Sequence, residues 1–325
     1  MKIVIASGKG GTGKTTVATN LAWVAALAGG EAAYADCDVE EPNGHLFLKP
    51  ALSGKQAIHK RIPVVDHERC AGCGECAKFC RFHALVCLNG KALVSSDLCH
   101  ACGGCQWVCP QQAITEALRE IGGVGWGRAG KLQFVHGCLQ VGQAQSPPVI
   151  HAVKAAVAPA ELTILDAPPG TSCPVVATAR GADFLLLVAE PTPFGLYDLG
   201  LALEMARTLR LDCGVVINRA RAGRLEARQF CQRARLPVLA EIPDDLAVAK
   251  AYSEGVLAVE AVPGLRQVFA QLLLRLASTV KGGALPEKVR RNLEKFAQAA
   301  EAPAGTNVQT PKILPFHKVS PPCLN

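Results

Sequence analysis

The sequence of 325 residues has few aromatic side chains and no long apolar run. Phe, Trp and Tyr together make up 5% of it, which is too few to suggest a platform on which nucleic-acid bases stack. No stretch approaches the ~18 uninterrupted apolar residues of a membrane-spanning helix. The apolar run before Ser7 is also too short for a signal peptide. We therefore expect a cytoplasmic protein without specific nucleic-acid binding.

Half of the residues are hydrophobic and 19% are charged, so the chain can bury a large core. The formal net charge is +7. The segment 280–325 contains seven Lys and Arg against three Asp and Glu, so 7 − 3 = +4 of that charge lies in the tail. The basic balance is thus a weak indication of a polyanionic partner.

Cysteine is the abundant residue, with 15 copies. A reducing compartment keeps thiols free, so clustered cysteines there indicate metal binding or catalysis rather than disulfides. Eight of them form two regular runs within residues 70–109. The distribution favours metal centres in one part of the chain.

Apolar runs alternate with helical patterns outside the cysteine region. A helix is expected at 16–28, at 196–210 and at 225–234, and strands at 2–6, 32–36, 162–166, 184–189, 214–217 and 238–242. The strands are continuously apolar, which indicates that both faces of the sheet are covered. We expect an α/β fold with a parallel sheet, and a glycine-rich bridge around Gly122–Gly130.

A phosphate-binding loop follows the first expected strand. Residues 8–15 read Gly-Lys-Gly-Gly-Thr-Gly-Lys-Thr and match G-x-x-x-x-G-K-[ST] between a strand and a helix. Backbone N–H groups of such a loop converge on phosphate oxygens. Lys14 is expected to reach the β- and γ-phosphates, and the Thr15 hydroxyl to bind Mg²⁺.

The second lysine of this loop, Lys9, is not needed to hold a phosphate of the same subunit. With it the loop resembles the deviant Walker A loop of the MinD/ParA/nitrogenase iron-protein class of P-loop ATPases. In that class the first lysine reaches the phosphates of a partner in a nucleotide-dependent homodimer. The resemblance implies catalytic roles for Lys9 and Lys14, and nucleotide contacts by Gly8, Gly10, Gly11, Thr12, Gly13, Lys14, Thr15 and Thr16.

Three later segments continue this resemblance. Asp36-Cys37-Asp38 resembles the class's Asp-x-Asp switch, which implies that Asp38 positions the attacking water and that Asp36 supports the Mg²⁺ shell. The segment 164–170 resembles the Walker B strand and second switch, with Asp166 holding the metal through water and Gly170 sensing the γ-phosphate. Asn218 matches the strand end whose Asn contacts adenine, although alone it could be a turn residue.

The two cysteine runs, at residues 70–80 and 99–109, have the same spacing. Each has the spacing C-x₂-C-x₂-C-x₃-C, and the doubled run is the pattern of bacterial two-cluster ferredoxins, in which the fourth cysteine serves the other cluster. Zinc is the competing interpretation, because C-x₂-C pairs also form zinc sites. The expected ligand sets of two [4Fe–4S] clusters are Cys70, Cys73, Cys76 and Cys109 for one, and Cys99, Cys102, Cys105 and Cys80 for the other.

The remaining cysteines are expected to be ordinary, with one open case. Cys173 lies just after the second switch, where a structural or partner-contact role is favoured over cluster ligation with Cys138. Cys87 is expected to be a small buried hydrophobe. Core positions are expected for Cys37, Cys213 and Cys231, and an exposed one for Cys323.

The expected organisation is an ATPase domain with an insert. The ATPase would comprise residues 1–57 and 117–280, a bacterial-ferredoxin-like α+β domain residues 58–116, and a C-terminal helix and disordered tail residues 281–325. The arrangement resembles MinD-type ATPases with an inserted ferredoxin domain. It implies ATP, Mg²⁺, two clusters, a homodimer formed on ATP binding, and a redox or Fe–S partner protein.

Three functions remain open at this stage. The first is an ATPase that gates electron transfer or partner interaction through the clusters. The second is an Fe–S assembly or carrier ATPase, against which counts the lack of a separate C-x-x-C. The third is a positioning ATPase at a membrane or on a partner complex, with the amphipathic segment 287–300 as a weak anchor. That segment is more often a docked terminal helix.

Overall fold

The computed structural model describes residues 1–221, 223 and 225–298. Its main element is a mixed sheet of nine strands among these residues, in the order β11-β10-β9-β1-β8-β2-β7-β6-β3. Neighbouring strands are parallel from β11 to β7, whereas β6 pairs antiparallel with β7 and with β3. The strands are β1 (Lys2–Ala6), β2 (Ala32–Asp36), β3 (Ala51–Val65), β6 (Ile114–Ala129), β7 (Leu132–Leu139), β8 (Leu162–Asp166), β9 (Phe184–Ala189), β10 (Cys213–Ala220) and β11 (Val238–Pro243).

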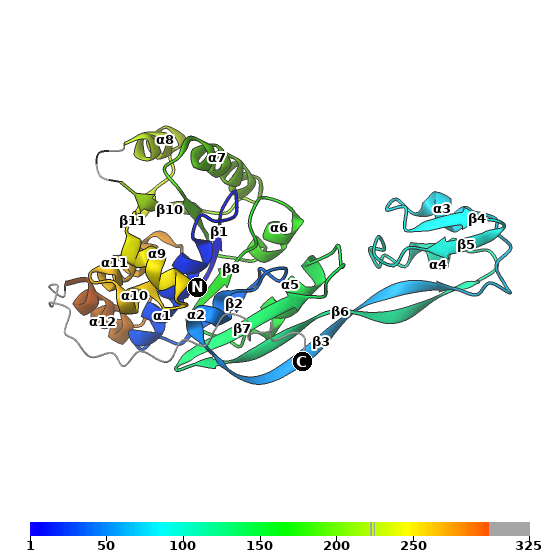
Figure 1. Cartoon of the computed structure of the whole chain (residues 1–325), viewed down its shortest axis with the longest axis horizontal. Coiled ribbons are helices and arrows are strands. Elements are labelled where there is room, and N and C mark those ends of the chain that lie inside the picture. Colours follow the sequence, from blue (N-terminus) through cyan, green and yellow to red (C-terminus); the bar gives the residue numbers. More distant parts are fainter. Residues whose placement is uncertain (222, 224, 299–325) are drawn as a thin grey trace.

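Helices cover both faces of the parallel part of the sheet (Figure 1). Ile3 and Ile5 of β1 lie in the core that includes one helical layer, while Val4 and Ala6 lie in the core on the other side. This alternation is the period of two that a strand imposes. The first layer contains α1 (Lys14–Leu27), α10 (Ala258–Ala261), α11 (Leu265–Thr279) and α12 (Glu287–Gln298); the second contains α5 (Pro147–Ala156), α6 (Cys173–Ala179), α7 (Pro193–Thr208) and α8 (Glu226–Ala234).

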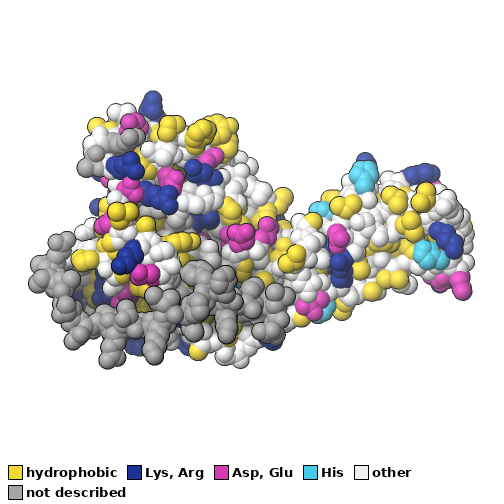
Figure 2. Space-filling view, in the orientation of Figure 1, with side chains coloured by type: hydrophobic (Ala, Val, Ile, Leu, Met, Phe, Trp, Pro, Cys, Tyr) yellow, Lys and Arg dark blue, Asp and Glu magenta, His cyan; other side chains and the backbone are white. Residues whose placement is uncertain are grey.

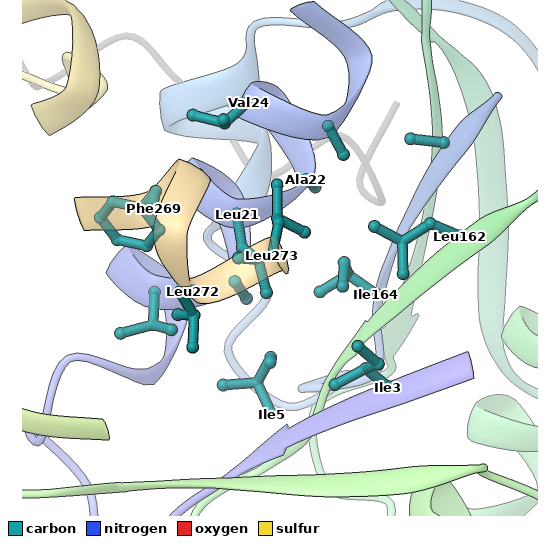
Figure 3. Close-up of a cluster of buried hydrophobic side chains, with 14 of the residues drawn as sticks. Ile3, Ile5, Leu21, Ala22, Val24, Leu162, Ile164, Phe269, Leu272 and Leu273 are labelled. Carbon is teal, nitrogen blue, oxygen red and sulfur yellow. The ribbon is translucent and has the colours of Figure 1, made fainter. Parts of the chain in front are cut away.

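The first of these cores is close-packed around β1. Ile3, Ile5, Leu21 and Ile164 are fully buried and meet Leu273 of α11 between the sheet and the helices (Figure 3). Each such aliphatic side chain contributes ~1.5–3 kcal/mol when removed from water. This core holds β1 and α1 on either side of the loop at residues 7–13.

An arm and a small module account for the cysteine region. Strands β3 and β6 continue beyond the sheet as a two-stranded ribbon, called the arm here, and residues 66–113 at its end form the cysteine module (Figures 1 and 2). The rest is called the body. The module contains α3 (Glu75–Phe79), α4 (Gly104–Trp107) and the hairpin of β4 (Leu85–Leu88) and β5 (Lys91–Val94). Both expected insert boundaries, 58 and 116, fall within the arm strands.

The glycine-rich segment expected as a bridge is strand β6, so that interpretation was wrong. Glycine is required there because the chains approach closely: a Cβ at Gly127 would lie 2.1 Å from the carbonyl oxygen of Ala51. The register slips between Ile58 and His59, opposite Gly122 and Glu120, which leaves Ile121 as an extra residue. This irregularity has the form of a β-bulge and lies where the arm leaves the sheet.

The other expected elements agree with the structure to within a few residues. The helix expected at 287–300 is α12, whose Val289 and Leu293 are buried against the body, and Asn292 Nδ2 donates to the carbonyl of Ala28 at 2.9 Å. Its apolar face is thus covered by the body, as expected for a docked helix rather than an anchor. Within the described residues, no helix is long and apolar enough to cross a membrane. The rest of the expected segment 281–325 beyond α12, residues 299–325 with Cys323, lies outside the described residues.

Candidate functional site

The loop at residues 7–13 connects β1 to the N-terminus of α1. Gly13 has φ +90°, and a Cβ there would lie 2.2 Å from Asn218 Nδ2, so only glycine fits. At Gly8 a Cβ would lie 2.1 Å from the carbonyl oxygen of Asp198. Among the described residues, no side chain caps α1, so its first N–H groups are free to bind an anion.

A cavity opens beside this loop, at the carboxyl edge of the sheet. Parallel strands all end at this edge, and side chains that follow them meet there. The cavity collects predicted residues from three separate segments of the chain. These are Gly10, Gly11, Gly13, Lys14, Thr15, Thr16, Asp38 and Asn218.

Asp166 lies behind the cavity and is fully buried. Its Oδ2 accepts a hydrogen bond from the Tyr34 hydroxyl at 3.0 Å, and its Oδ1 is buried without a hydrogen-bond partner among the described residues. Burial raises the pKa of Asp166, while Lys14 and the Thr15 hydroxyl lower it. An unpaired buried carboxylate oxygen beside a Thr hydroxyl fits a Mg²⁺ shell.

Asp36 is held by backbone N–H groups of the segment that follows β2. Its carboxylate accepts from the backbone N–H groups of Asp38 at 3.2 Å, Asn43 at 3.2 Å and Gly44 at 2.9 Å. Burial and the neighbouring Asp166 raise its pKa well above the usual range. These contacts fix the segment after β2, and its role toward Mg²⁺ stays a prediction.

Asp38 lines the cavity, whereas Asp36 does not. Burial, and next the charge of Asp166, raise the pKa of Asp38 to about 7, while Lys14 lowers it. A carboxyl group with a pKa near neutrality is suited to accept a proton from water. The role of Asp38 beside the attacking water stays a prediction.

Asn218 is tied to the phosphate loop. Its Nδ2 donates to the carbonyl of Thr12 at 2.8 Å, so the amide both supports the loop and lines the cavity. Gly170 has φ +93° and its N–H donates to the carbonyl of Ser7 at 3.0 Å. The second switch is therefore in backbone contact with the residue that begins the loop.

Lys9 does not line the cavity and forms an ion pair within its own subunit. Its Nζ lies 3.8 Å from Glu190 Oε2, and the other carboxylate oxygen of Glu190 accepts from Arg219 Nη1 at 2.5 Å. About a third of the Lys9 side chain is exposed. It is thus accessible to a second subunit once this ion pair opens.

One wall of the cavity consists of residues that no sequence motif marks. It is formed by the last residue of β11, by the two residues that follow this strand, and by side chains of α9 (Leu246–Ser253). These residues carry no motif, and only their place after a strand end gives a signal. They are Pro243, Asp244, Asp245, Val248, Ala249 and Tyr252, and Glu41 and Asn43 also line the cavity.

Two further cavities lie in the cysteine module, and each is lined by one of the two predicted ligand sets. The inner cavity has Arg61, Pro63 and Glu116 of the arm in its wall, whereas the outer cavity reaches Ile114 at the far end of β6. The inner cavity is lined by Cys80, Cys99, Cys102 and Cys105, and the outer one by Cys70, Cys73, Cys76 and Cys109. Cys80 of the first run thus lies with the second run, and Cys109 of the second run lies with the first, while their role as cluster ligands stays a prediction.

The thiols outside the two runs differ in burial. Cys87 lines the outer cavity, and its Sγ donates to the carbonyl of Gly72 at 3.6 Å. Cys37 and Cys231 are buried as expected, whereas Cys213 is only half-buried. Cys173 is exposed and begins α6, while Cys138 is half-buried in β7. Among the described residues, no three His, Cys, Asp or Glu side chains converge as for a single metal ion.

Comparison with known proteins gives the family. Residues 3–259 match the CobQ/CobB/MinD/ParA nucleotide binding domain. Protein MJ0578 of Methanocaldococcus jannaschii is 31% identical over 225 residues, which cover 67% of this chain and 78% of that protein. The ATP-binding protein MJ0547 of the same organism is 25% identical over 297 residues, which cover 90% of this chain and 92% of that protein.

Solved structures support the same fold. The MinD of the MinC:MinD cell division complex of Aquifex aeolicus has a TM-score of 0.52 and 17% identity, covering 88% of this chain and 97% of that one. The cell division ATPase MinD of Pyrococcus furiosus has a TM-score of 0.50 and 21% identity, and the match covers 83% of this chain and 95% of that one. At such identities the likeness concerns the fold alone. Together with the match over residues 3–259, these findings show that the chain belongs to the CobQ/CobB/MinD/ParA family of P-loop nucleotide-binding proteins.

Proposed function

We propose that this protein is a dimerising ATPase that couples ATP binding and hydrolysis to electron transfer or partner interaction through two [4Fe–4S] clusters. The observation that carries the proposal is the pair of module cavities, because each is lined by the four cysteines that the ferredoxin pattern assigns to one cluster. The arm that carries them is built from strands of the same sheet as the nucleotide cavity.

The nucleotide end of the mechanism uses residues already together in the structure. Lys14 and the loop N–H groups bind the phosphates, and Thr15 with Asp166 holds Mg²⁺. Asp38 lines the same cavity and orients the attacking water. Lys9 leaves Glu190 to contact the phosphates of a partner subunit, which makes hydrolysis depend on the dimer.

The cluster end rests on the chemistry of the thiols. Cys76, Cys99 and Cys105 are buried, which keeps solvent from part of each cavity. When bound, two such clusters supply one-electron transfer steps. The module presents exposed Phe79, Leu88 and Trp107, side chains that a partner protein would cover.

The test is anaerobic purification of the full chain, followed by iron and sulfide counts, EPR and ATPase rates on the same sample. About eight Fe per chain are expected for two cubanes. Reduction potentials and partner affinity should differ between the ADP, ATP and nucleotide-free states. Zinc in place of iron, or potentials that are identical in all three states, would contradict the proposal.

A positioning ATPase that acts on a partner complex is the second candidate. It is favoured by the fold shared with MinD, which in Aquifex aeolicus is found in a complex with MinC. Under this alternative the module would be a binding surface rather than a redox unit. Retention of ATP-dependent partner binding in a variant that lacks all eight cluster cysteines would favour it.

A further inference from the structure

The cysteine module contacts the body as well as the arm. The carbonyl oxygen of Cys99, in the wall of the inner cavity, accepts from Gln145 Nε2 at 3.0 Å and from Lys60 Nζ at 3.2 Å. Lys60 belongs to the arm, whereas Gln145 belongs to the body loop between β7 and α5. The carbonyl oxygen of Cys99, a predicted cluster ligand, is therefore held by one donor from the arm and one from the body.

The loop that carries Gln145 begins at the nucleotide switch. The N–H of Leu139, the last residue of β7, donates to the carbonyl of Val39 at 2.7 Å, and Val39 directly follows Asp38. The next N–H, of Gln140, donates to the carbonyl of Ile121 at 2.9 Å. Ile121 is the extra residue of the bulge where the arm leaves the sheet.

The segment 139–145 thus touches three places that must move together if nucleotide state is to affect the module. These are the backbone beside Asp38, the base of the arm, and the wall of the inner cavity. Further contacts join the arm and the module: Arg119 pairs with Asp97 at 3.0 Å, and its guanidinium also donates to the Ser96 hydroxyl. The loop 95–99 is therefore fixed to the arm on one side and to the body on the other.

We infer that the segment 139–145 couples the nucleotide cavity to the inner cavity, with Gln145 as a positioning residue for the backbone of Cys99. The inference rests on the proposed function. Displacement of Asp38 and Val39 by the γ-phosphate would shift Leu139 and Gln140 through their hydrogen bonds. The shift would reach the hydrogen bond at Cys99, and hydrogen bonds and solvent access near the thiolates set the reduction potential of a cluster.

The route predicts that only the inner of the two clusters senses nucleotide. The outer cavity lies at the far end of the arm, with Gln111 and Ile114 in its wall. Within the described residues no hydrogen bond or ion pair joins its wall to the body, whereas Gln145 of the body donates to Cys99 in the wall of the inner cavity. The inner cluster is identified by the EPR signal that a Cys102→Ser variant loses.

The experiment compares Gln145→Leu with Gln143→Leu in the full chain with its clusters. Leu has a similar size but cannot donate, and Lys60 still holds Cys99, so both variants should keep about eight Fe. Gln143 lies in the same loop, and within the described residues its side chain forms no hydrogen bond or ion pair with the module. Gln145→Lys restores a donor of similar reach.

EPR-monitored redox titrations are run without nucleotide, with Mg-ADP and with a non-hydrolysable ATP analogue. We expect the nucleotide-dependent change in the inner midpoint potential to fall by at least half in Gln145→Leu, and to persist in Gln143→Leu and Gln145→Lys. Hydrogen exchange of residues 96–103 should lose its nucleotide dependence in parallel. Nucleotide affinity should stay unchanged.

Two outcomes separate the inference from the proposed function. A wild-type change that Gln145→Leu retains in full would overturn this route and leave nucleotide gating intact. A wild type in which neither potential depends on nucleotide would overturn the gating itself, and the route with it. A change confined to the outer cluster would also overturn the route.

Discussion

The hydroxyl of Tyr34 donates to Asp166 across two adjacent strands, at 3.0 Å, inside the sheet. The ring stacks on Phe134, with centroids 5.7 Å apart, so the phenol is held in place by packing. Burial and the nearby carboxylates raise the pKa of Tyr34 well above its usual range, which keeps the phenol a donor. One oxygen of Asp166 is thus occupied and the other is left for a Mg²⁺ shell.

Replacing Tyr34 by Phe should therefore weaken Mg²⁺ binding while keeping the packing. Loss of a buried hydrogen bond to a charged group costs about 1.5–3 kcal/mol, and the pKa of Asp166 rises further without this donor. We expect Mg²⁺ affinity at pH 7 to fall by roughly 10-fold, the equivalent of about 1.4 kcal/mol. Titration of Mg²⁺ against ATP binding measures it, with Tyr197→Phe on the exposed face of α7 as control. Equal affinities in both variants would show that Tyr34 does not serve the metal site.

The ion pair between Lys9 and Glu190 predicts opposite effects for two variants. Lys9→Ala should bind ATP normally through Lys14 and fail to form the ATP-dependent dimer. Glu190→Gln releases Lys9 from an ion pair at 3.8 Å. Because a partly exposed pair contributes about 0.5–1 kcal/mol, the protein concentration at which the dimer forms should fall by roughly 3-fold. Sedimentation with a non-hydrolysable ATP analogue measures both, and Lys91→Ala on the module is the control. A normal dimer in Lys9→Ala would disprove the role of this lysine.

His136 should make the cluster-free protein less stable in acid. Burial, and next the charge of His45, lower the pKa of His136 from 6.5 to about 4, and its buried Nδ1 has no partner among the described residues. Between these two pH values the unfolded chain binds more protons, so this stabilisation is complete above pH 6.5 and is lost as the pH falls toward 4. The shift of 2.5 units corresponds to about 3 kcal/mol at most.

A variant isolates this contribution from neighbouring groups. His45, whose pKa burial also lowers, acts in the same direction. The adjacent Asp36 has a raised pKa and acts in the opposite direction. His136→Leu cannot titrate, so its free energy of unfolding in urea should fall less steeply between pH 6.5 and 4 than that of the wild type. If the free energy of unfolding fell equally steeply with pH in both proteins, a group other than His136 would be responsible for the pH dependence.

Cys87 lines the outer cavity but belongs to neither predicted ligand set. Cys87→Ala should keep about eight Fe per chain, whereas Cys73→Ala should retain about four, because it breaks one cubane. Iron and sulfide counts with EPR after anaerobic purification measure the difference. Loss of a cluster in Cys87→Ala, with retention in Cys73→Ala, would revise the ligand set.

The body could be predicted from the sequence because its signals are local. The runs Lys2–Ala6 and Leu162–Asp166 are mostly apolar and bounded by polar or turn residues, so each strand matches its prediction. The loop between Ser7 and Lys14 carries its chemistry in consecutive residues. The two cysteine runs likewise encode their partition between two cavities by spacing alone.

The arm and one wall of the nucleotide cavity could not be predicted in the same way. Strand β6 has four glycines and four charged residues among its 16 residues, so it carries no continuous apolar run. Its pairing with β3 joins residues up to 128 − 51 = 77 positions apart, as in Ala51 with Arg128. Gly127 is needed for close approach to Ala51, a constraint that only the paired strands reveal. Tyr252 and Val248 reach the cavity because α9 follows β11, and no motif marks them.

The bulge at Ile121 gives the arm the properties of a lever. Beyond it, residues 58–65 and 114–121 form a ribbon of eight residues a strand, a length of roughly 25 Å at about 3.3 Å per residue. A rotation of roughly 10° at the bulge would carry the far end through roughly 4 Å at that radius. Sub-ångström shifts of the nucleotide switch would thereby become displacements large enough to change the distance between a redox centre and its partner.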